Sequence, residues 1–233
     1  MKNPTIQADV ENKITVEDTV YLRIPIKTRI LQSGDDFVEI IKEYAKPHLQ
    51  QNDIIVISES PLAITQGRSI CANDIKIGFL AKFLWRFVGK VSYGTGLRSP
   101  TSMQCAIDEC GSFRILFAAI IGGFSKIVLR RKGDFYRIAG KQAALIDAAH
   151  TSPVDGYQSH VIKGPLNPEK EAQKIKDSTG YETAIMDIND IGGSWVIGYS
   201  KGINPRLLEN IMRDNPQGQG NELTPICIVR KVK

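Results

Sequence analysis

The sequence contains few of the residues that bind zinc or form disulfide frameworks. It has four cysteines and three histidines among 233 residues, and no two cysteines form a C-x-x-C pair. Because zinc sites use such paired ligands at short spacing, no zinc site is expected. Reduced thiols are the expected state, as in a cytosolic protein. The cysteines are Cys71, Cys105, Cys110 and Cys227.

Aromatic residues are also scarce, at 7%, and no signature of a nucleic-acid-binding module is present. The net charge of +5 and the pI of about 9.0 therefore favour small anionic or phosphorylated ligands over nucleic acid. One region is rich in basic residues, which predicts either a solvated basic face or a site for phosphate or carboxylate groups. These residues are Lys126, Arg130, Arg131, Lys132, Arg137 and Lys141.

Long apolar runs are missing as well. The most apolar one, 115–129, is interrupted by Ser125 and Lys126, and a bilayer span needs about 20 apolar residues. We expect a buried or interface helix here, with a segment on a membrane surface as the alternative. The first twelve residues are polar and lack the apolar part of a signal peptide. The expected location is the cytoplasm, with no transmembrane segment.

The apolar pattern mixes helices and strands without regular βαβ alternation, which predicts an α+β fold with mixed sheets and packed helices. Cap-plus-proline pairs at 99–100, 167–168 and 204–205 mark helix starts. Pro153 and Gly156 suggest a division into 1–150 and 151–233, unless the chain forms one intertwined domain. The expected strands are 21–26, 53–58, 135–139, 143–147, 181–188, 194–200 and 225–232, and further helices are expected at 37–44 and 74–89.

Acidic residues stand where two of these strands are expected to end. Asp187 ends one apolar run, with Asp190 and a glycine turn just after it, and Asp147 ends another. Mg²⁺ prefers one or two carboxylates together with waters and substrate phosphates. If the two strands lie side by side, Asp147, Asp187 and Asp190 form a site for Mg²⁺ or Mn²⁺. The alternative is that these residues only make turns and helix caps.

A glycine-containing segment precedes the helix that Ser99 caps. Gly94 and Gly96 allow the backbone to approach a ligand closely, and Arg98 offers a guanidinium to an anion. The free N–H groups of the following helix point at the same place. The segment therefore predicts an anion or nucleotide site, although an ordinary loop before a capped helix has the same pattern.

Two other segments are candidates for nucleotide or anion binding. In the first, the residues Ser58, Glu59 and Ser60 end a strand, and Gly67 and Arg68 follow. Active sites often lie beyond strand ends, but hydroxyls there also form loops. The second is the glycine-rich segment 215–222, which either contacts a phosphate or metal or serves as a flexible hairpin connection.

These segments, in this order, resemble the coenzyme F420-0:gamma-glutamyl ligase family. The resemblance covers about residues 20–70 and 140–233, whereas 75–137 resembles a divergent branch with the pattern GTGLRSPxSMQxAIDE. Six stretches are similar to family motifs, namely Gly34–Asp36 (helix start), Asn52–Ser58 (GDVLVVTSK), Thr65–Arg68 (SKxEGR), Leu145–His150 (NAGID-SN), Leu166–Ala172 (DPDG-A--L) and Asp187–Asp190 (DTxGR). The stretch 218–230 resembles the final loop and strand.

The resemblance implies the family's fold, a homodimer, and a reaction that joins L-glutamate to a phosphate-containing deazaflavin with GTP and a divalent metal. It implies that Asp147 and Asp187 are metal ligands, and that 58–60 and 28–31 border the nucleotide. The metal would neutralise charge on the transferring phosphoryl group.

The sequence departs from the family at several of these positions. Ile64 replaces a lysine, Gln66 a glutamate, Ile188 a threonine and His150 an asparagine. Loss of the lysine removes a charge that binds phosphate. Two functions therefore stay open: a metal- and nucleotide-dependent amide ligase with a diverged substrate, and a non-catalytic ligand-binding or interaction protein on the same fold.

Overall fold

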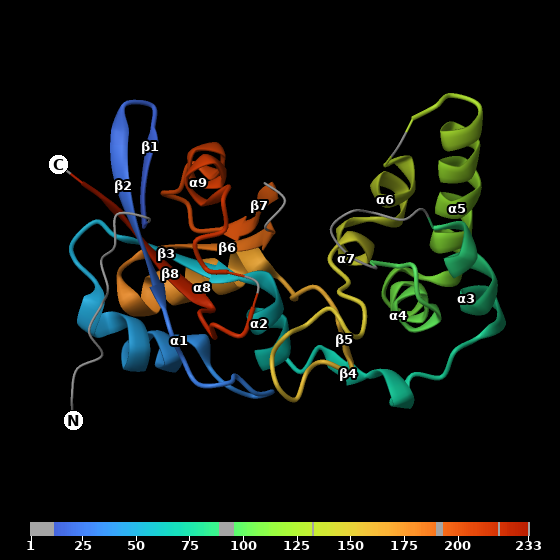
Figure 1. Ribbon diagram of the computed structural model, residues 1–233, viewed down its shortest axis with the longest axis horizontal. Helices are drawn as coiled ribbons and strands as arrows, with labels where there is room; N and C mark the ends of the chain where they lie inside the picture. The colour runs from blue at the N-terminus through green and yellow to red at the C-terminus, as the bar shows by residue number, and fades with distance from the viewer. Residues whose placement is uncertain (1–11, 89–95, 132, 190–192, 219, 233) are drawn as a thin grey trace. The chain divides into compact units, whose positions relative to one another are not determined.

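The computed structural model describes residues 12–88, 96–131, 133–189, 193–218 and 220–232 (Figure 1). The fold is α+β, as the sequence predicts. Two compact units divide the chain: unit 1 holds 1–31, 35–62 and 167–233, and unit 2 holds 32–34 and 63–166. The expected boundary at 150 lies within unit 2, and the division of the chain into domains stays a prediction.

Unit 1 is built on a sheet with the strand order β1-β2-β8-β3-β6-β7 in the described residues. Only β3 and β6 run parallel, and the other neighbouring pairs are antiparallel. The five strands expected in this unit are confirmed as β2 Thr19–Ile26, β3 Ile54–Ser58, β6 Glu182–Asn189, β7 Gly193–Tyr199 and β8 Ile226–Lys231. The edge strand β1, Lys13–Val16, was not expected.

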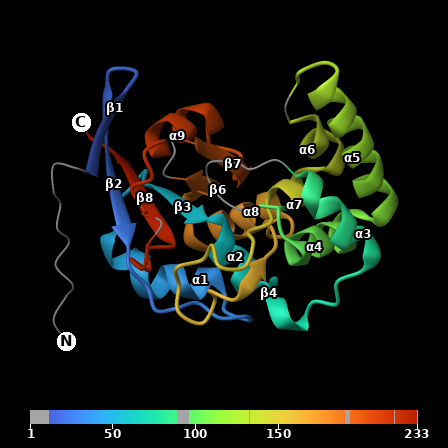
Figure 2. The same cartoon turned by 45° about the vertical axis from the view of Figure 1, so that its right-hand side comes forward.

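Helices cover both faces of this sheet (Figure 2). Successive strand residues point to opposite faces. Ala184 and Met186 share a core with α9, whereas Gly198, which pairs with Ile185 on the other face, approaches the start of α8. A Cβ at Gly198 would lie 2.4 Å from the carbonyl carbon of Pro168, so this approach requires glycine. The helical segments are α1 Phe37–Ile40, extended by turns at Ile41–Ala45 and Lys46–His48, with α8 Pro168–Thr179 and α9 Pro205–Met212.

The predicted helix caps explain where these helices begin. Asn204 accepts a hydrogen bond from the backbone N–H of Leu207, and Pro205 follows at the first helical position. Asn167 and Pro168 start α8 as predicted, but Asn167 has a φ of +46° and its side chain makes no cap hydrogen bond; the helix ends at Gly180 in the left-handed conformation. Both helix starts are confirmed.

Unit 2 consists mainly of helices around a separate apolar core. Ser99 caps α4 by accepting from the N–H of Ser102, and Gly111 ends that helix, as the sequence predicts. A short antiparallel pair joins β4 to β5. The elements are β4 Ser69–Cys71, α3 Phe79–Leu84 with a turn at Trp85–Phe87, α4 Pro100–Cys110, α5 Ser112–Ile127, α6 Asp134–Ala139, α7 Lys141–Ala144 and β5 His160–Ile162. The helix α2, Glu59–Thr65, leads into this unit from β3.

Two strands expected in this unit are wrong, and one expected helix is shorter than predicted. The run 135–139 is not a strand, because α6 occupies it, and neither is 143–147, where α7 ends at Ala144 and Asp147 forms only an isolated bridge. Gly133 and Gly140, both at positive φ, bracket α6, and Phe135 packs on Gly122 of α5. Short apolar runs fit a strand or a buried helix equally well, so packing decides between them. The helix expected at 74–89 is confined to α3 and the turn after it.

Among the described residues, no single helix has both the length and the apolar character needed to cross a membrane. The pair α4 and α5 passes that test only when its two helices are taken together, and the pair is bent by 116°.

Candidate functional site

The parallel pair β3 and β6 brings two predicted site segments to the same end of the sheet. Ser58 pairs with Met186 in register, so Glu59 and Asp187 each directly follow a paired residue. Glu59 is buried and begins α2, which turns the chain away from the sheet. Parallel strands present their carboxyl ends at one edge of a sheet, where ligands commonly bind. The structure therefore brings Ser58, Glu59 and Ser60 together with Asp187.

The end of β2 and the loop before β8 lie at the same place. Ile26 and Ile57 both pair with Ile226, the first residue of β8. The backbone N–H of Ser58 donates to Pro225 at 2.9 Å, and that of Thr28 donates to Leu223 at 2.8 Å. We call this end of the sheet the C-terminal rim, defined by residues 28, 58–60, 187 and the loop 213–225.

One buried amide in the rim has an unused acceptor. The side chain of Gln217 is only 4% exposed, and its Nε2 donates to the carbonyl of Thr224 at 3.0 Å. Its Oε1 has no hydrogen-bond partner among the described residues. A buried carbonyl oxygen without a donor is costly, and such atoms mark places where a ligand or water donates. The sequence singled out the loop 215–222 but gave no signal for this residue.

One glycine of this loop has a backbone conformation that favours glycine. Gly218 has a φ of +75°, in the left-handed region that other residues rarely adopt. Contact with a phosphate or metal and service as a flexible connection both stay predictions for 215–222.

The number of carboxylates in the rim bears on whether it can bind a metal ion. Within the described part of the chain, no group of three or more His, Cys, Asp or Glu side chains could hold a metal ion. Mg²⁺ needs only one or two protein carboxylates when phosphates and waters complete its shell. The rim holds two carboxylates, Glu59 directly after β3 and Asp187 near the end of β6. Asp190 lies outside the described residues.

Asp147 is placed differently from the expectation. Its backbone forms an isolated antiparallel bridge with Ile162, through hydrogen bonds of 2.8 and 3.1 Å. The neighbours of β6 in the sheet are β3 and β7, so the condition stated for a shared metal site, that the run ending at Asp147 lies as a strand beside β6, is not met. Asp147 belongs to unit 2, and its role as a metal ligand stays a prediction.

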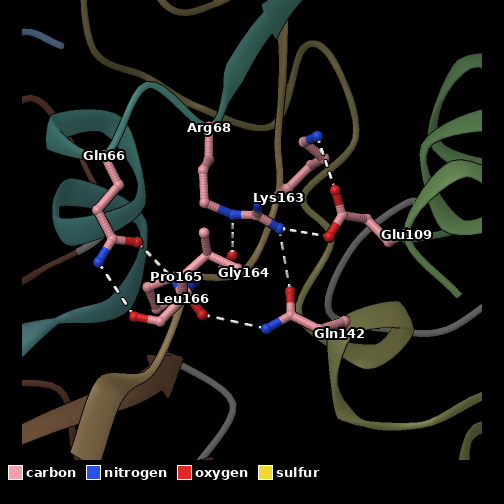
Figure 3. Close-up of polar contacts among 8 residues, drawn as sticks. All are labelled: Gln66, Arg68, Glu109, Gln142, Lys163, Gly164, Pro165 and Leu166. Carbon is pink, nitrogen blue, oxygen red and sulfur yellow. Dashed lines mark hydrogen bonds and ion pairs between the residues drawn. The ribbon is translucent and has the colours of Figure 1, made fainter. Parts of the chain in front are cut away.

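Arg68, a predicted anion-binding residue, is buried in a polar cluster of unit 2 (Figure 3). Its Nε donates to the carbonyl of Gly164, and one terminal nitrogen donates to Glu109 at 2.7 Å and to Gln142 at 3.2 Å. Lys163 binds the other oxygen of Glu109 at 2.7 Å. Arg68 thus joins α4, α7 and the segment after β5.

The charges of this cluster compensate one another. Burial alone would raise the pKa of Glu109, but hydrogen bonds from Lys163 and Arg68 outweigh it and hold the pKa below its ordinary value. Glu109 therefore stays ionised between its two cations. No signal in the sequence pointed to Glu109 and Lys163, because the contacts of Glu109 with Arg68 and with Lys163 join residues 41 and 54 positions apart along the chain.

The residues around Arg68 are also engaged within unit 2 (Figure 3). Gln66 accepts from the N–H of Leu166 at 2.7 Å and donates to its carbonyl at 3.1 Å. Ile64, at the position of the family's lysine, is buried beside Ala63 and Ile162. Apolar packing therefore occupies a position where the family has a charge, while Gly67 makes the turn with a φ of +70°.

Two of the three residues predicted to bind an anion before α4, Gly96 and Arg98, are described by the structure. Arg98 is exposed, and Gly96 has a φ of +48°. The hydroxyl of Ser102 donates to the carbonyl of Gly96 at 2.7 Å, which ties the loop to the first turn of the helix. Gly94 lies outside the described residues.

Two of the four cysteines are buried thiols that are unsuited to act as nucleophiles. All four are free thiols. Burial raises the pKa of Cys105 to about 11 and that of Cys227 to about 12, so neither forms the reactive thiolate at neutral pH.

Comparison with known proteins agrees with the architecture. A distant relative is the uncharacterized protein MJ1361 of Methanocaldococcus jannaschii, which is 25% identical over 177 residues. The match includes 70% of this chain and 55% of the relative, so the chain spans about half the length of the curated protein it matches. The profile of the F420-0:gamma-glutamyl ligase family matches residues 25–194, which include the rim strands β3 and β6. The chain belongs to the F420-0:gamma-glutamyl ligase family.

Proposed function

We propose that the protein is a metal- and nucleotide-dependent ligase that forms an amide bond of the γ-glutamyl type on an anionic or phosphorylated substrate. The observation that carries this proposal is the C-terminal rim, where β3 ends at Ser58 in register with Met186 of the parallel strand β6, so that Glu59 and Asp187 follow at the same level of the sheet. Membership of the family supports the reaction type, with glutamate as the amine donor and GTP or another nucleotide as the phosphoryl donor.

In this proposal the rim residues hold the nucleotide and its metal. Asp187 and Glu59 supply carboxylates to Mg²⁺ or Mn²⁺, and Asp147 and Asp190 are further predicted ligands. The hydroxyls of 58 and 60 donate to phosphate oxygens. The bound metal supplies charge neutralisation during phosphoryl transfer. The oxygen of Gln217 that lacks a donor accepts from a ligand N–H or O–H group.

The proposed reaction has two steps. A substrate carboxylate oxygen attacks the terminal phosphorus of the nucleotide, which forms an acyl phosphate and releases the nucleoside diphosphate. The amine then attacks the acyl carbon, and inorganic phosphate leaves with the amide formed. Gly96 and Arg98, in the loop before α4, are proposed to bind an anionic part of a ligand.

The second candidate function is a non-catalytic binding or interaction protein, and one observation favours it. Ile64 is buried where the family has a lysine, and Arg68 is committed to Glu109, Gln142 and Gly164. The lysine expected near phosphate is therefore absent, and the arginine expected there binds other groups of the protein.

A thermal-shift experiment separates the two functions. We expect Mn²⁺ with GTP to raise the melting temperature by about 5 °C or more, since saturating ligand adds about 2–3 kcal/mol to the stability of the folded state. Asp187→Asn should abolish this shift. Asp177→Asn, which makes the same charge change on the exposed surface of α8, should leave it intact.

Catalysis is then tested with glutamate and a carboxylate substrate such as F420-0. The ligase proposal predicts inorganic phosphate release that depends on both substrates and is lost in Asp187→Asn. Nucleotide and metal binding without turnover would favour the binding protein, and flat melting curves for every metal and nucleotide would contradict the proposed site itself.

A further inference from the structure

The outer face of α5 is apolar and exposed. Phe113 is 90% exposed and Ile127 is 81% exposed, at the two ends of the helix. Between them the exposed large side chains recur three or four residues apart, which places all of them on one face. These intermediate residues are Leu116, Phe117, Ile120 and Phe124.

The opposite side of α5 faces the core of unit 2. Ile115 and Ala118 are fully buried, and a Cβ at Gly122 would lie 2.9 Å from the Cβ of Phe135 on α6. The helix is therefore anchored in the fold by one side and presents the apolar stripe on the other. An exposed apolar face of this size marks an interaction surface.

The neighbouring helix α3, which contacts α5 (Figure 2), continues this character. Phe79 is 84% exposed, and Phe83 and Phe87 are also exposed, with ring centres 5.1 Å apart. These three residues repeat every four positions. Lys82 and Arg86 are interleaved with them and are exposed too.

Charge is distributed very unevenly along the chain. Residues 75–141, which contain both helices, hold twelve Lys and Arg but only three Asp and Glu. The remaining residues hold eighteen basic and twenty-two acidic side chains. The whole positive charge of the protein thus comes from the segment that carries the apolar stripe.

The acidic side chains of this segment already have partners. Glu109 is held by Arg68 and Lys163, and Asp134 by Arg131 and Arg137. The third, Asp108, accepts from Gln104 at 2.7 Å. The segment therefore presents a surplus of positive charge, which includes Arg114, Lys126 and Arg130 on and just after α5; all three are exposed.

We propose that α3 and α5 dock the protein on an anionic lipid surface, with α5 lying in the plane of the membrane interface. Exposed phenylalanines and aliphatic side chains enter the boundary between headgroups and acyl chains, while the basic side chains reach lipid phosphates. Negative lipid attracts each basic residue near the surface. This inference does not rest on the proposed ligase activity.

Charge favours a lipid surface over a second copy of the chain. In a symmetric dimer the same patch meets itself, so the basic residues beside each stripe would face those of the partner copy. An anionic bilayer complements both the stripe and its charge.

Vesicle flotation of the full chain tests the proposal. We expect binding to vesicles of phosphatidylcholine containing about one third phosphatidylglycerol, little binding to phosphatidylcholine alone, and weaker binding at high salt. Replacing Phe113 and Phe117 with serine should lower the partition coefficient at least about tenfold. The exposed apolar control Leu166→Ser should not change it.

A second pair of variants tests the charge. Lys126→Glu with Arg130→Glu should lower binding to the anionic vesicles by at least about fivefold for each residue, whereas Lys170→Glu with Lys201→Glu, exposed lysines of unit 1, should not. Melting curves confirm that the variants fold. The proposal is overturned if the full chain does not float with anionic vesicles. It is also overturned if the phenylalanine substitutions instead dissociate a dimer in solution and leave flotation unchanged.

Discussion

At the residue scale, Glu109 is the group whose chemistry the structure defines most sharply. Two cations, from Arg68 and Lys163, each bind one of its oxygens at 2.7 Å, and its side chain is 16% exposed. Removing a charged partner from such a cluster leaves the other charges uncompensated. Glu109→Gln should therefore lower the free energy of unfolding by about 2–3 kcal/mol, as measured by denaturant titration at neutral pH.

The pH dependence of stability gives an independent prediction for the same carboxyl. Its pKa in the folded chain lies below the ordinary 4.5, so the unfolded chain binds the proton more readily. The stabilisation is then complete above about pH 4.5 and is lost as the pH falls through the lower, folded value. Glu109→Gln should flatten the stability profile in that acid range. Asp108→Asn, at the adjacent exposed carboxyl, should leave the slope unchanged, and equal slopes in all three proteins would contradict the prediction.

The residues of the candidate site were predictable to different degrees. Ser58, Glu59 and Asp187 were singled out because each stands at or just after an apolar run in the sequence, and that signal is local; their role as site residues stays a prediction. Arg68 looked like an anion ligand for the same local reason, a glycine followed by an arginine. Its actual partners are 41, 74 and 96 residues away, so only the folded chain reveals them. The unpaired oxygen of Gln217 has no local signal at all.

At the element scale, two adjacent glycines of α5 differ in what surrounds them. A Cβ at Gly122 would meet Phe135 of α6 at 2.9 Å, whereas nothing lies within 4 Å of one at Gly123. Gly122→Ala should lower the stability by about 1–3 kcal/mol through overpacking of the two helices. Gly123→Ala should instead raise it by about 0.5–1 kcal/mol, because alanine favours the helix.

Thermal melting of the two alanine variants gives the measurement, with the wild-type chain as reference. A neutral Gly122→Ala would mean that α6 does not pack on α5 as described, and a destabilised Gly123→Ala would mean that the space beside Gly123 is occupied. Either result would also weaken the view that α5 is anchored by one face only.

The starts of helices were predicted correctly where the cap depends only on residues next to one another in the sequence. The caps at Ser99 and Asn204 depend on one side chain and one nearby N–H group, and both are confirmed. The runs 135–139 and 143–147 were misassigned because four or five apolar residues fit either a strand or a helix. Contact of α6 with α5 selects the helix, and that contact is not encoded within the run itself.

At the scale of the whole molecule, the sequence established the fold class and the family, because the α+β pattern and the ordered motifs extend along most of the chain. It did not predict which residues share a core, since unit 1 combines 35–62 with 167–233 across more than a hundred residues. The basic segment 75–141 was visible in the sequence, but the exposure of its apolar stripe required the structure.

Because the two units have separate apolar cores, we expect a bound ligand to stabilise one region of the chain rather than all of it. If the C-terminal rim binds nucleotide and metal, the ligand adds stability to the segments that form it, and amide exchange slows there first. In hydrogen exchange of the full chain, GTP with Mn²⁺ should protect peptides covering 54–62, 184–189 and 213–226, and should leave α5 unchanged. Asp187→Asn should remove this protection. Protection around 145–149 would support Asp147 as a ligand, whereas protection confined to unit 2 would place the nucleotide away from the rim and contradict the proposed site.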